Sequence, residues 1–269
     1  MVIENLSPRT ITSYLHAPRQ LINYWGLPPE KIGSEEIYAF LVYLKEEKKQ
    51  SRSTIRIAVS GIRYLYRNFL GRSEIVDEIP YPKSEKYLPE ILSGKELKCL
   101  FDGTGNVKHR VLLKLIYSAG LRVGEVQGIR LGDIDRKNMQ IRIRQGKGRK
   151  DRNVPLSKHL LKELEVYYRK YTPQTYLFNG RNKGDRISVT AMRWVLKSAI
   201  KREGISNTIH LHSLRHSFAS HHLSMGTNLF LIQRLLGHES IRTTMVYLHI
   251  NYRMDGKVKN PLDVMYAEQ

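Results

Sequence analysis

The chain has 269 residues, with 45 Lys and Arg against 25 Asp and Glu, and a formal net charge of +20 at pH 7. Its length suggests one or two domains, and 41% hydrophobic residues argue against wholesale disorder. No apolar run approaches the ~20 residues of a membrane span. The first seven residues lack the layout of a secretory signal peptide. A single cysteine, Cys99, excludes an internal disulfide and fits a reducing cytosol, so we interpret it as a packing residue.

The positive charge is unevenly distributed along the chain. Residues 1–86 carry 13 Lys and Arg against 10 Asp and Glu, whereas residues 87–269 carry 32 against 15. Such an excess indicates a polyanionic partner, because cationic side chains that neutralise phosphates release condensed counterions. A ribosomal protein or a membrane-surface protein would fit the charge equally well. Charge alone therefore predicts a polyanionic partner and does not indicate whether the chain is an enzyme.

The first eighty residues have the pattern of helices. Ser34 is expected to cap a helix over Glu35–Lys48, with Glu35 and Glu36 in its first turn. A second helix, from Ser53 to Phe69, carries one apolar stripe of Ile55, Val59, Ile62, Tyr66 and Phe69. Four arginines lie off this stripe, at Arg52, Arg56, Arg63 and Arg67. They could form a solvated face, but we favour contact with a DNA backbone.

A stiff connector follows this region. Gly71 ends the second helix, and residues 79–89 hold three prolines among polar residues. Such a segment is extended and typical of a domain boundary. We therefore predict a helical DNA-binding domain at residues 1–79, a linker at 80–89 and a second domain at 90–269.

The second domain is predicted to be mixed. Ser93 caps one helix, and another over Lys108–Ala119 ends at Gly120, just before Arg122. Residues 139–156 alternate apolar and basic side chains around a glycine-containing turn, which predicts a β-hairpin with a basic tip. The rest returns to helices, over Lys158–Tyr171, Val189–Glu203, Leu211–Met225, Leu229–Leu236 and Ile241–Ile250.

Five side chains of this domain form a candidate catalytic set. His212 and Arg215 share one helix face at i, i+3 spacing, His238 follows the glycine that ends a helix, and Tyr247 lies nearby. Arg122 lies about ninety residues upstream. Guanidinium groups bind phosphate oxygens bidentately and keep their charge, imidazole transfers protons near neutral pH, and a phenol can act as a covalent nucleophile. These groups suffice to break a phosphodiester without a metal.

Taken singly, each of these residues is more often structural. Tyr247 could be a core aromatic, one of 16 tyrosines in the chain. The histidines at 210, 212, 216, 221 and 222 could form a polar cluster or a metal site. The metal hypothesis is weak, because no cysteine or acidic residue stands at ligand spacing. We expect no metal ligand, and we interpret His216, His221 and His222 as packing or surface residues.

The order and spacing of several segments resemble the tyrosine recombinases, the phage integrase family. The segments that carry the resemblance are residues 115–125, 146–148, 152–156, 212–221 and 235–247, and the similarity covers roughly residues 90–265. Xer-type and integron-type members are the nearest in style, although the extra insert of the integron enzymes is absent. Leu248 and Gly124 replace a commoner threonine and serine, with little expected consequence. The first eighty residues resemble the family's core-binding domain only in pattern and size.

The resemblance implies a mainly α fold with a small β-sheet: a two-domain clamp of a helical, SAM-like core-binding domain and an α+β catalytic domain. It implies that Tyr247 attacks the scissile phosphate and forms a 3′-phosphotyrosyl link without metal, ATP or another cofactor. Further implied roles fall on Arg122 and Arg215 as a phosphate clamp, Lys147 as proton donor to the 5′-oxygen, His212 in proton transfer, and His238 as hydrogen-bond partner of the phosphate.

The implied partner is double-stranded DNA. Two strand exchanges, through a Holliday junction, would recombine two duplexes. We expect DNA contacts from the basic hairpin at Arg142, Arg144, Arg149, Lys150 and Arg152. The C-terminal tail, with apolar Leu262, Val264 and Met265, is expected to dock on a neighbouring protomer of a dimer or tetramer, although packing within its own chain stays open. The implied location is cytoplasmic, on the nucleoid.

Three other functions stay open. A type IB topoisomerase would use the same chemistry on a single duplex without strand exchange. A non-catalytic DNA-binding protein would need only the basic charge, but it would have no use for a phenol opposite two arginines. A histidine-rich metalloprotein would be inactivated by chelators.

Overall fold

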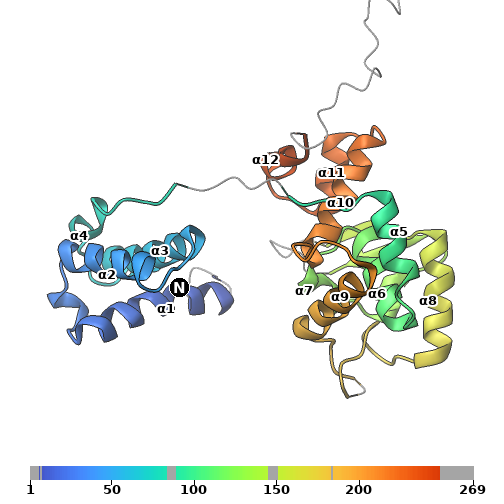
Figure 1. The fold of residues 1–269 in the computed structure, drawn as a ribbon, viewed down its shortest axis with the longest axis horizontal. Helices are drawn as coiled ribbons and strands as arrows, with labels where there is room; N and C mark the ends of the chain where they lie inside the picture. The colour runs from blue at the N-terminus through green and yellow to red at the C-terminus, as the bar shows by residue number, and fades with distance from the viewer. Residues whose placement is uncertain (1–5, 7, 84–88, 145–150, 183, 249–269) are drawn as a thin grey trace, which may run out of the picture. The chain divides into compact units, whose positions relative to one another are not determined.

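The computed structural model describes residue 6 and residues 8–83, 89–144, 151–182 and 184–248. The chain divides into two compact units, Met1–Tyr87 and Leu88–Gln269. Both units are built mainly of helices, and the second holds one small sheet (Figure 1). The predicted fold class is therefore confirmed. Among the described residues, no helix has the length and apolar character needed to cross a membrane.

The N-terminal unit is a small helical bundle. It contains α1 (Pro8–Trp25), the 3-10 helix η1 (Pro29–Lys31), α2 (Ser34–Glu46), α3 (Arg52–Asn68) and α4 (Glu74–Asp77). Helix α1 packs closely on α3, where a Cβ at Gly61 would meet the carbonyl oxygen of Tyr14 at 2.4 Å. The core includes Leu21, Phe40 and Tyr66.

The two predicted N-terminal helices end earlier in the structure, at Glu46 and at Asn68, and two further details of the prediction are wrong. Helix α2 begins at Ser34 itself, with Gly33 as N-cap, because the carboxylate of Glu36 accepts the Gly33 N–H at 2.9 Å. The stripe on α3 is buried as predicted at Ile55, Val59, Ile62 and Tyr66, but Phe69 is 71% exposed. Helix α3 ends at Asn68, so Phe69 lies in the cap, outside the regular helical stripe.

The C-terminal unit begins with three helices and a sheet. These are α5 (Gly94–Asp102), α6 (Val107–Ser118), α7 (Val123–Gly128), η2 (Leu131–Asp133), β1 (Ile134–Asp135), β2 (Gln140–Ile143) and β3 (Arg152–Pro155). The sheet has the order β1-β2-β3 with antiparallel pairs, and Ile141 faces Val154 across the hairpin. Both the hairpin and the Ser93 cap are confirmed. Helix α7 and strand β1 were not predicted.

The described part of this unit contains five more helices. They are α8 (Lys158–Tyr171), α9 (Val189–Glu203), α10 (Leu211–Ser224), α11 (Leu229–Leu236) and α12 (Ile241–Thr244), followed by the 3-10 helix η3 (Met245–Tyr247). The predicted spans of α8, α9 and α11 are confirmed. The predicted helix Ile241–Ile250 was wrong in that its α-helical part ends at Thr244; residues from 249 onward lie outside the described part of the chain.

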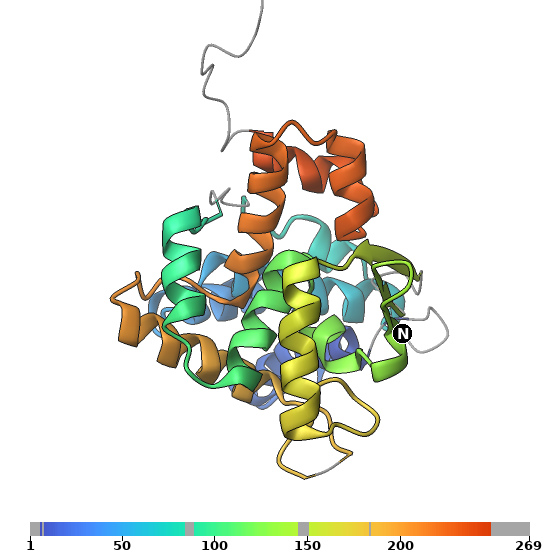
Figure 2. The same cartoon turned by 90° about the vertical axis from the view of Figure 1, so that its right-hand side faces the viewer.

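Helix α6 lies in the middle of this unit and packs against α8 and α10. Helices α11 and α12 gather at one end, in orange and red (Figures 1 and 2). A continuous apolar core, including Leu113, Ile116, Leu214 and Phe218, fixes α10 against α6. This packing determines where the polar groups of α10 lie.

Gly120 follows the end of α6, where the chain changes direction and passes close to α10. Its φ is +57°, and a Cβ there would meet Phe218 Cδ1 at 2.6 Å and Leu236 Cδ2 at 3.0 Å. Only glycine satisfies both constraints without strain. The close approach brings the ends of α6 and α11 to the same side of α10.

We expect Gly120→Ala to destabilise the C-terminal unit by ~2–4 kcal/mol, since strain at positive φ adds to overpacking. Gly204→Ala is the matched control. The φ of Gly204 is +62°, but nothing lies within 4 Å of the added Cβ, so the free energy of unfolding should fall by only ~1 kcal/mol. Urea unfolding followed by Trp194 fluorescence in a Trp25→Phe background measures both. Equal losses would contradict the close packing.

Candidate active site

Tyr247 belongs to η3 and is buried, with 1% of its surface exposed. Its hydroxyl lies 2.9 Å from Nδ1 of His216 on α10, and the two ring centroids are 5.7 Å apart. Burial raises the pKa of Tyr247, although the nearby charges of Arg215 and Arg122 oppose this shift. The phenol is therefore protonated at neutral pH and has a histidine as its hydrogen-bond partner.

Arg215 is completely buried on α10. Its Nη1 donates to the carbonyl oxygen of Gly120 at 2.5 Å, and its Nη2 donates to that of Leu236 at 2.7 Å. Its Nε is buried and has no hydrogen-bond partner among the described residues. Burial, with the neighbouring charge of Arg122, lowers the pKa of Arg215 to about 9, so the guanidinium stays charged at neutral pH.

Arg122 is the N-cap residue of α7, and its side chain is 24% exposed. Its Nη2 donates to the carbonyl oxygen of Gly237 at 3.0 Å, and its Nη1 donates to Oε1 of Glu125 at 2.9 Å. The carbonyls that hold Arg122 and Arg215 thus belong to the consecutive residues Gly237 and Leu236. The structure brings together two arginines that are ninety-three positions apart in the sequence.

Glu125 holds the arginine cluster together and was assigned no role from the sequence. Its side chain is 6% exposed, and its oxygens accept two hydrogen bonds of 2.8 Å from Arg152. Arg215 Nη1 lies 3.9 Å away. Burial alone would raise the pKa of Glu125, but the hydrogen bonds and charge of Arg152, the Arg122 N–H and Arg215 outweigh it and lower the pKa. The carboxylate is therefore ionised among three guanidinium groups.

The one local signal for Glu125 was its position three residues after Arg122. A glutamate there can accept the N–H of the helix cap, and Arg122 N donates to Glu125 Oε2 at 2.8 Å. This pattern identifies a helix start. It does not indicate that the carboxylate also binds Arg152 on a distant strand.

Three histidines lie around the cluster. His238 Nδ1 lies 2.9 Å from Thr244 Oγ1, and the His212 ring meets His216 edge-on at 4.6 Å. Burial and the positive charges nearby lower the pKa of His238 to about 3 and that of His216 to about 4. Burial also lowers the pKa of His212, although part of this residue is exposed to solvent. All three imidazoles are neutral at pH 7.

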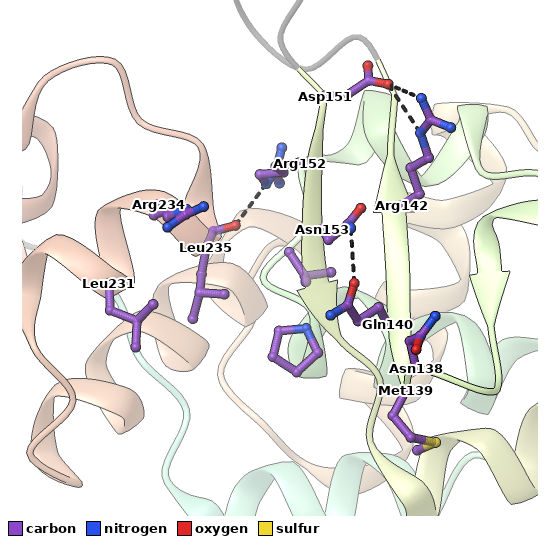
Figure 3. Close-up of a pocket in the computed structure, with 12 residues that line it drawn as sticks. Asn138, Met139, Gln140, Arg142, Asp151, Arg152, Asn153, Leu231, Arg234 and Leu235 are labelled. Carbon is purple, nitrogen blue, oxygen red and sulfur yellow. Dashed lines mark hydrogen bonds and ion pairs between the residues drawn. The ribbon is translucent and has the colours of Figure 1, made fainter.

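The predicted DNA contacts of the hairpin differ in their surroundings. Arg142 pairs with Asp151 at 2.9 Å, Arg144 pairs with Asp133 at 2.6 Å, and both arginines are exposed. Arg152 is 10% exposed at its side chain, and its Nε donates to Leu235 O at 2.8 Å across a groove of about 870 Å³ between the hairpin and α11 (Figure 3). This geometry favours an internal role for Arg152 over a contact with DNA. Lys147, Arg149 and Lys150 lie outside the described residues.

The arginines of α3 contact the segment that follows the helix. Arg56 donates to the Pro82 carbonyl, Arg63 Nη2 donates to Ile79 O at 2.7 Å, and both guanidinium groups lie over the Tyr81 ring. Arg67 pairs with Asp77 at 2.5 Å, and Arg52 is exposed. Contact of these four residues with DNA stays a prediction. Within the described residues, no three His, Cys, Asp or Glu side chains gather as a metal site would need.

We expect Glu125→Gln to lower the free energy of unfolding of the C-terminal unit by ~3 kcal/mol, because it leaves buried guanidinium groups without a counter-charge. Sulfate should recover part of this loss by binding at the arginine cluster as a replacement counter-charge. Glu163→Gln is the matched control, since that carboxylate also pairs with two cations, Arg110 and Lys114, but outside the cluster. Urea unfolding with and without sulfate measures both. An equal response to sulfate in the two variants would contradict the role given to Glu125.

We also expect stability to fall as the pH drops from about 6.5 towards 4. The pKa values of His216 and His238 are lower in the folded state than in the unfolded state, so the unfolded chain binds protons first in this window. Stability is thus fully present above pH 6.5 and is lost below it. His238→Gln should flatten the profile measured by urea unfolding. An unchanged slope would contradict burial of a neutral His238.

Comparison with known proteins places the chain in a family. Residues 90–254 match the phage integrase family, and residues 1–74 match the phage integrase N-terminal SAM-like domain. The chain is 36% identical to a putative integrase/recombinase, y4qK, of Sinorhizobium fredii, over 98% of its own length and 86% of that protein. It is 31% identical to the tyrosine recombinase XerC of Staphylococcus epidermidis, over 96% of the chain and 92% of that protein.

The fold is also similar to that of the XerA recombinase. The TM-score is 0.57 at 26% identity, over 99% of this chain and 94% of that one. Helices, sheet and the convergent arginines are thus found in a chain whose full length aligns with recombinases. The chain belongs to the phage integrase family and is a tyrosine-type site-specific recombinase.

Proposed function

We propose that Tyr247 is the nucleophile of this recombinase and that Arg122 and Arg215 bind the scissile phosphate. The observation that carries the proposal is the anchoring of both guanidinium groups on the adjacent carbonyls of Leu236 and Gly237, eleven and ten residues before Tyr247. Two guanidinium groups held side by side can bind the two non-bridging oxygens of a phosphodiester. Their charge stabilises the anion that develops in the transition state.

The buried Nε of Arg215 supports this assignment. An unsatisfied buried donor costs ~1–3 kcal/mol, and a charged group costs more. A phosphate oxygen bound at the cluster would satisfy the donor. The site is therefore organised for an anion before the anion binds.

In the proposed reaction, the Tyr247 oxygen attacks phosphorus and the bond to the 5′-oxygen breaks. A 3′-phosphotyrosyl link forms, and Lys147 supplies the proton that the 5′-oxygen takes up. His238 hydrogen-bonds the phosphate, and His212 assists proton transfer. Because the link retains the energy of the broken bond, a 5′-hydroxyl of a partner strand can reseal it without ATP. Two such exchanges through a Holliday junction recombine two duplexes.

The remaining parts of the proposal concern DNA binding and assembly. Exposed Arg142 and Arg144 contact backbone phosphates, together with Arg149 and Lys150 of the hairpin tip. The C-terminal tail joins protomers into a dimer or tetramer on DNA. We place the enzyme in the cytoplasm, on the nucleoid, where its substrate lies. Arg152 is reassigned from DNA contact to holding Glu125.

Covalent trapping on DNA of random sequence tests the nucleophile and recovers the target site in one experiment. Wild-type protein is incubated with a library of random-sequence duplexes, and DNA that stays attached in SDS is recovered and sequenced. We expect a defined site, with the linkage mapped to Tyr247 and unaffected by excess EDTA. Tyr247→Phe should bind the recovered site normally and form no adduct. An adduct that persists in this variant would overturn the assignment.

The phosphate clamp is tested on a nicked duplex that carries the recovered site. Arg122→Ala and Arg215→Lys should each slow adduct formation by at least ~10²-fold, the scale for losing one preorganised anion donor. Arg202→Ala is the control, since that guanidinium on α9 donates to Gly103 O, outside the site. A loss below threefold at Arg122 or Arg215 would contradict the clamp. Formation of a Holliday junction separates recombination from simple nicking and resealing.

A further inference from the structure

His216 is the side chain that contacts the hydroxyl of Tyr247. Its Nδ1 lies 2.9 Å from the phenol oxygen, across the junction between α10 and η3. His212, one helical turn earlier, meets the His216 ring edge-on at 4.6 Å. Among the described residues, the hydroxyl thus bonds to His216, whereas His212 contacts it only through the His216 ring. The sequence had suggested a packing or surface role for His216.

The surroundings of His216 leave its lone pair available. The titratable and charged groups that face it are His212 and Arg215 on its own helix, His210 just before that helix, and Tyr247 from η3. Burial, followed by the charges of these histidines and Arg215, lowers the pKa of His216 to about 4. A neutral imidazole beside a protonated phenol can accept a hydrogen bond and then the proton.

We propose that His216 is the general base of the cleavage step, and that it accepts the proton of Tyr247 on Nδ1 as the phenol oxygen attacks. This inference rests on the proposed function, in which Tyr247 is the nucleophile. It assigns the first proton transfer to the residue next to Arg215, and His212 assists this transfer through its contact with the His216 ring. The accepting ring carries its own hydrogen on Nε2.

The step balances in atoms and charge. The O–H bond of Tyr247 breaks, its proton passes to Nδ1 of His216, and the oxygen electron pair forms the bond to phosphorus. The bond between phosphorus and the 5′-oxygen breaks, and that oxygen keeps the electron pair and takes a proton from Lys147. In resealing, the attacking 5′-hydroxyl gives its proton back to Lys147, the bond between phosphorus and the Tyr247 oxygen breaks, and the His216 imidazolium returns its proton to the leaving phenolate.

A base is needed because the free phenol is a weak nucleophile. With an ordinary tyrosine pKa near 10, about one hydroxyl in 10³ is ionised at pH 7, and burial raises the pKa of Tyr247 further. General base catalysis typically contributes ~10²–10⁴-fold. The entering phosphate is an anion, so it raises the pKa of His216 and stabilises the imidazolium at the moment when the proton moves.

The pH dependence of single-turnover adduct formation on the nicked duplex tests the proposal. Wild-type activity should rise with pH and then level off. His216→Ala should be ~10²-fold slower at pH 7 and keep rising with a slope near 1 up to pH 9, because hydroxide must then remove the proton. His216→Gln keeps a hydrogen-bonding group but cannot accept a proton, and we expect the same profile from it. Added imidazole should partly restore His216→Ala.

Controls separate the possible failures. His222→Ala removes a histidine of the same helix that bonds Thr227 instead, and it should behave as wild type. His212→Ala should be slower and yet level off with pH. A wild-type rate in His216→Gln, or a loss that is equal at every pH, would overturn the proposal in favour of mere positioning. Failure of wild-type protein to form any Tyr247 adduct would instead overturn the proposed function.

Discussion

The site depends on one buried carboxylate that lies among three guanidinium groups. Arg122, Arg152 and Arg215 would repel one another in a low-dielectric interior, and Glu125 offsets only part of their charge. The remaining positive charge is fixed in place before any substrate arrives. Preorganisation of this kind stabilises a transition-state anion without a cost for reorienting dipoles during the reaction. The same partial compensation keeps the free protein stable enough to fold.

Helix ends supply the other half of the anchoring. The last carbonyls of a helix lack intrahelical partners and carry partial negative charge. Arg215 bonds the carbonyl of Gly120 at the end of α6, while Arg122 bonds that of Gly237 at the end of α11. Both glycines have positive φ, as a left-handed helix terminus requires. Two helix terminations thus position two cations, and this explains why glycine stands at both places.

The sequence predicted most helices and the hairpin, because these follow from local periodicity, but it missed α7 and β1. The arginine, histidine and tyrosine set of the candidate site was implied by the resemblance to the family. Glu125, Arg152 and His216 acquire their roles only through contacts between distant segments, which periodicity does not encode. Two arginines of the hairpin illustrate this limit of prediction from sequence. Arg152 and Arg142 are near-neighbours on one hairpin with the same chemistry, but one is buried against Glu125 and the other is exposed.

Arg215 and His216 are consecutive residues, so one helix carries both a residue of the proposed phosphate clamp and the contact with Tyr247. Their adjacency also links the two functions electrostatically. An imidazolium beside Arg215 is unfavourable in the free protein, and this is part of why the pKa of His216 is low. A phosphate held by Arg215 reverses that balance, because its negative charge favours the protonated ring. Under the proposed function, proton transfer from Tyr247 to His216 is therefore more favourable when DNA occupies the clamp than in its absence.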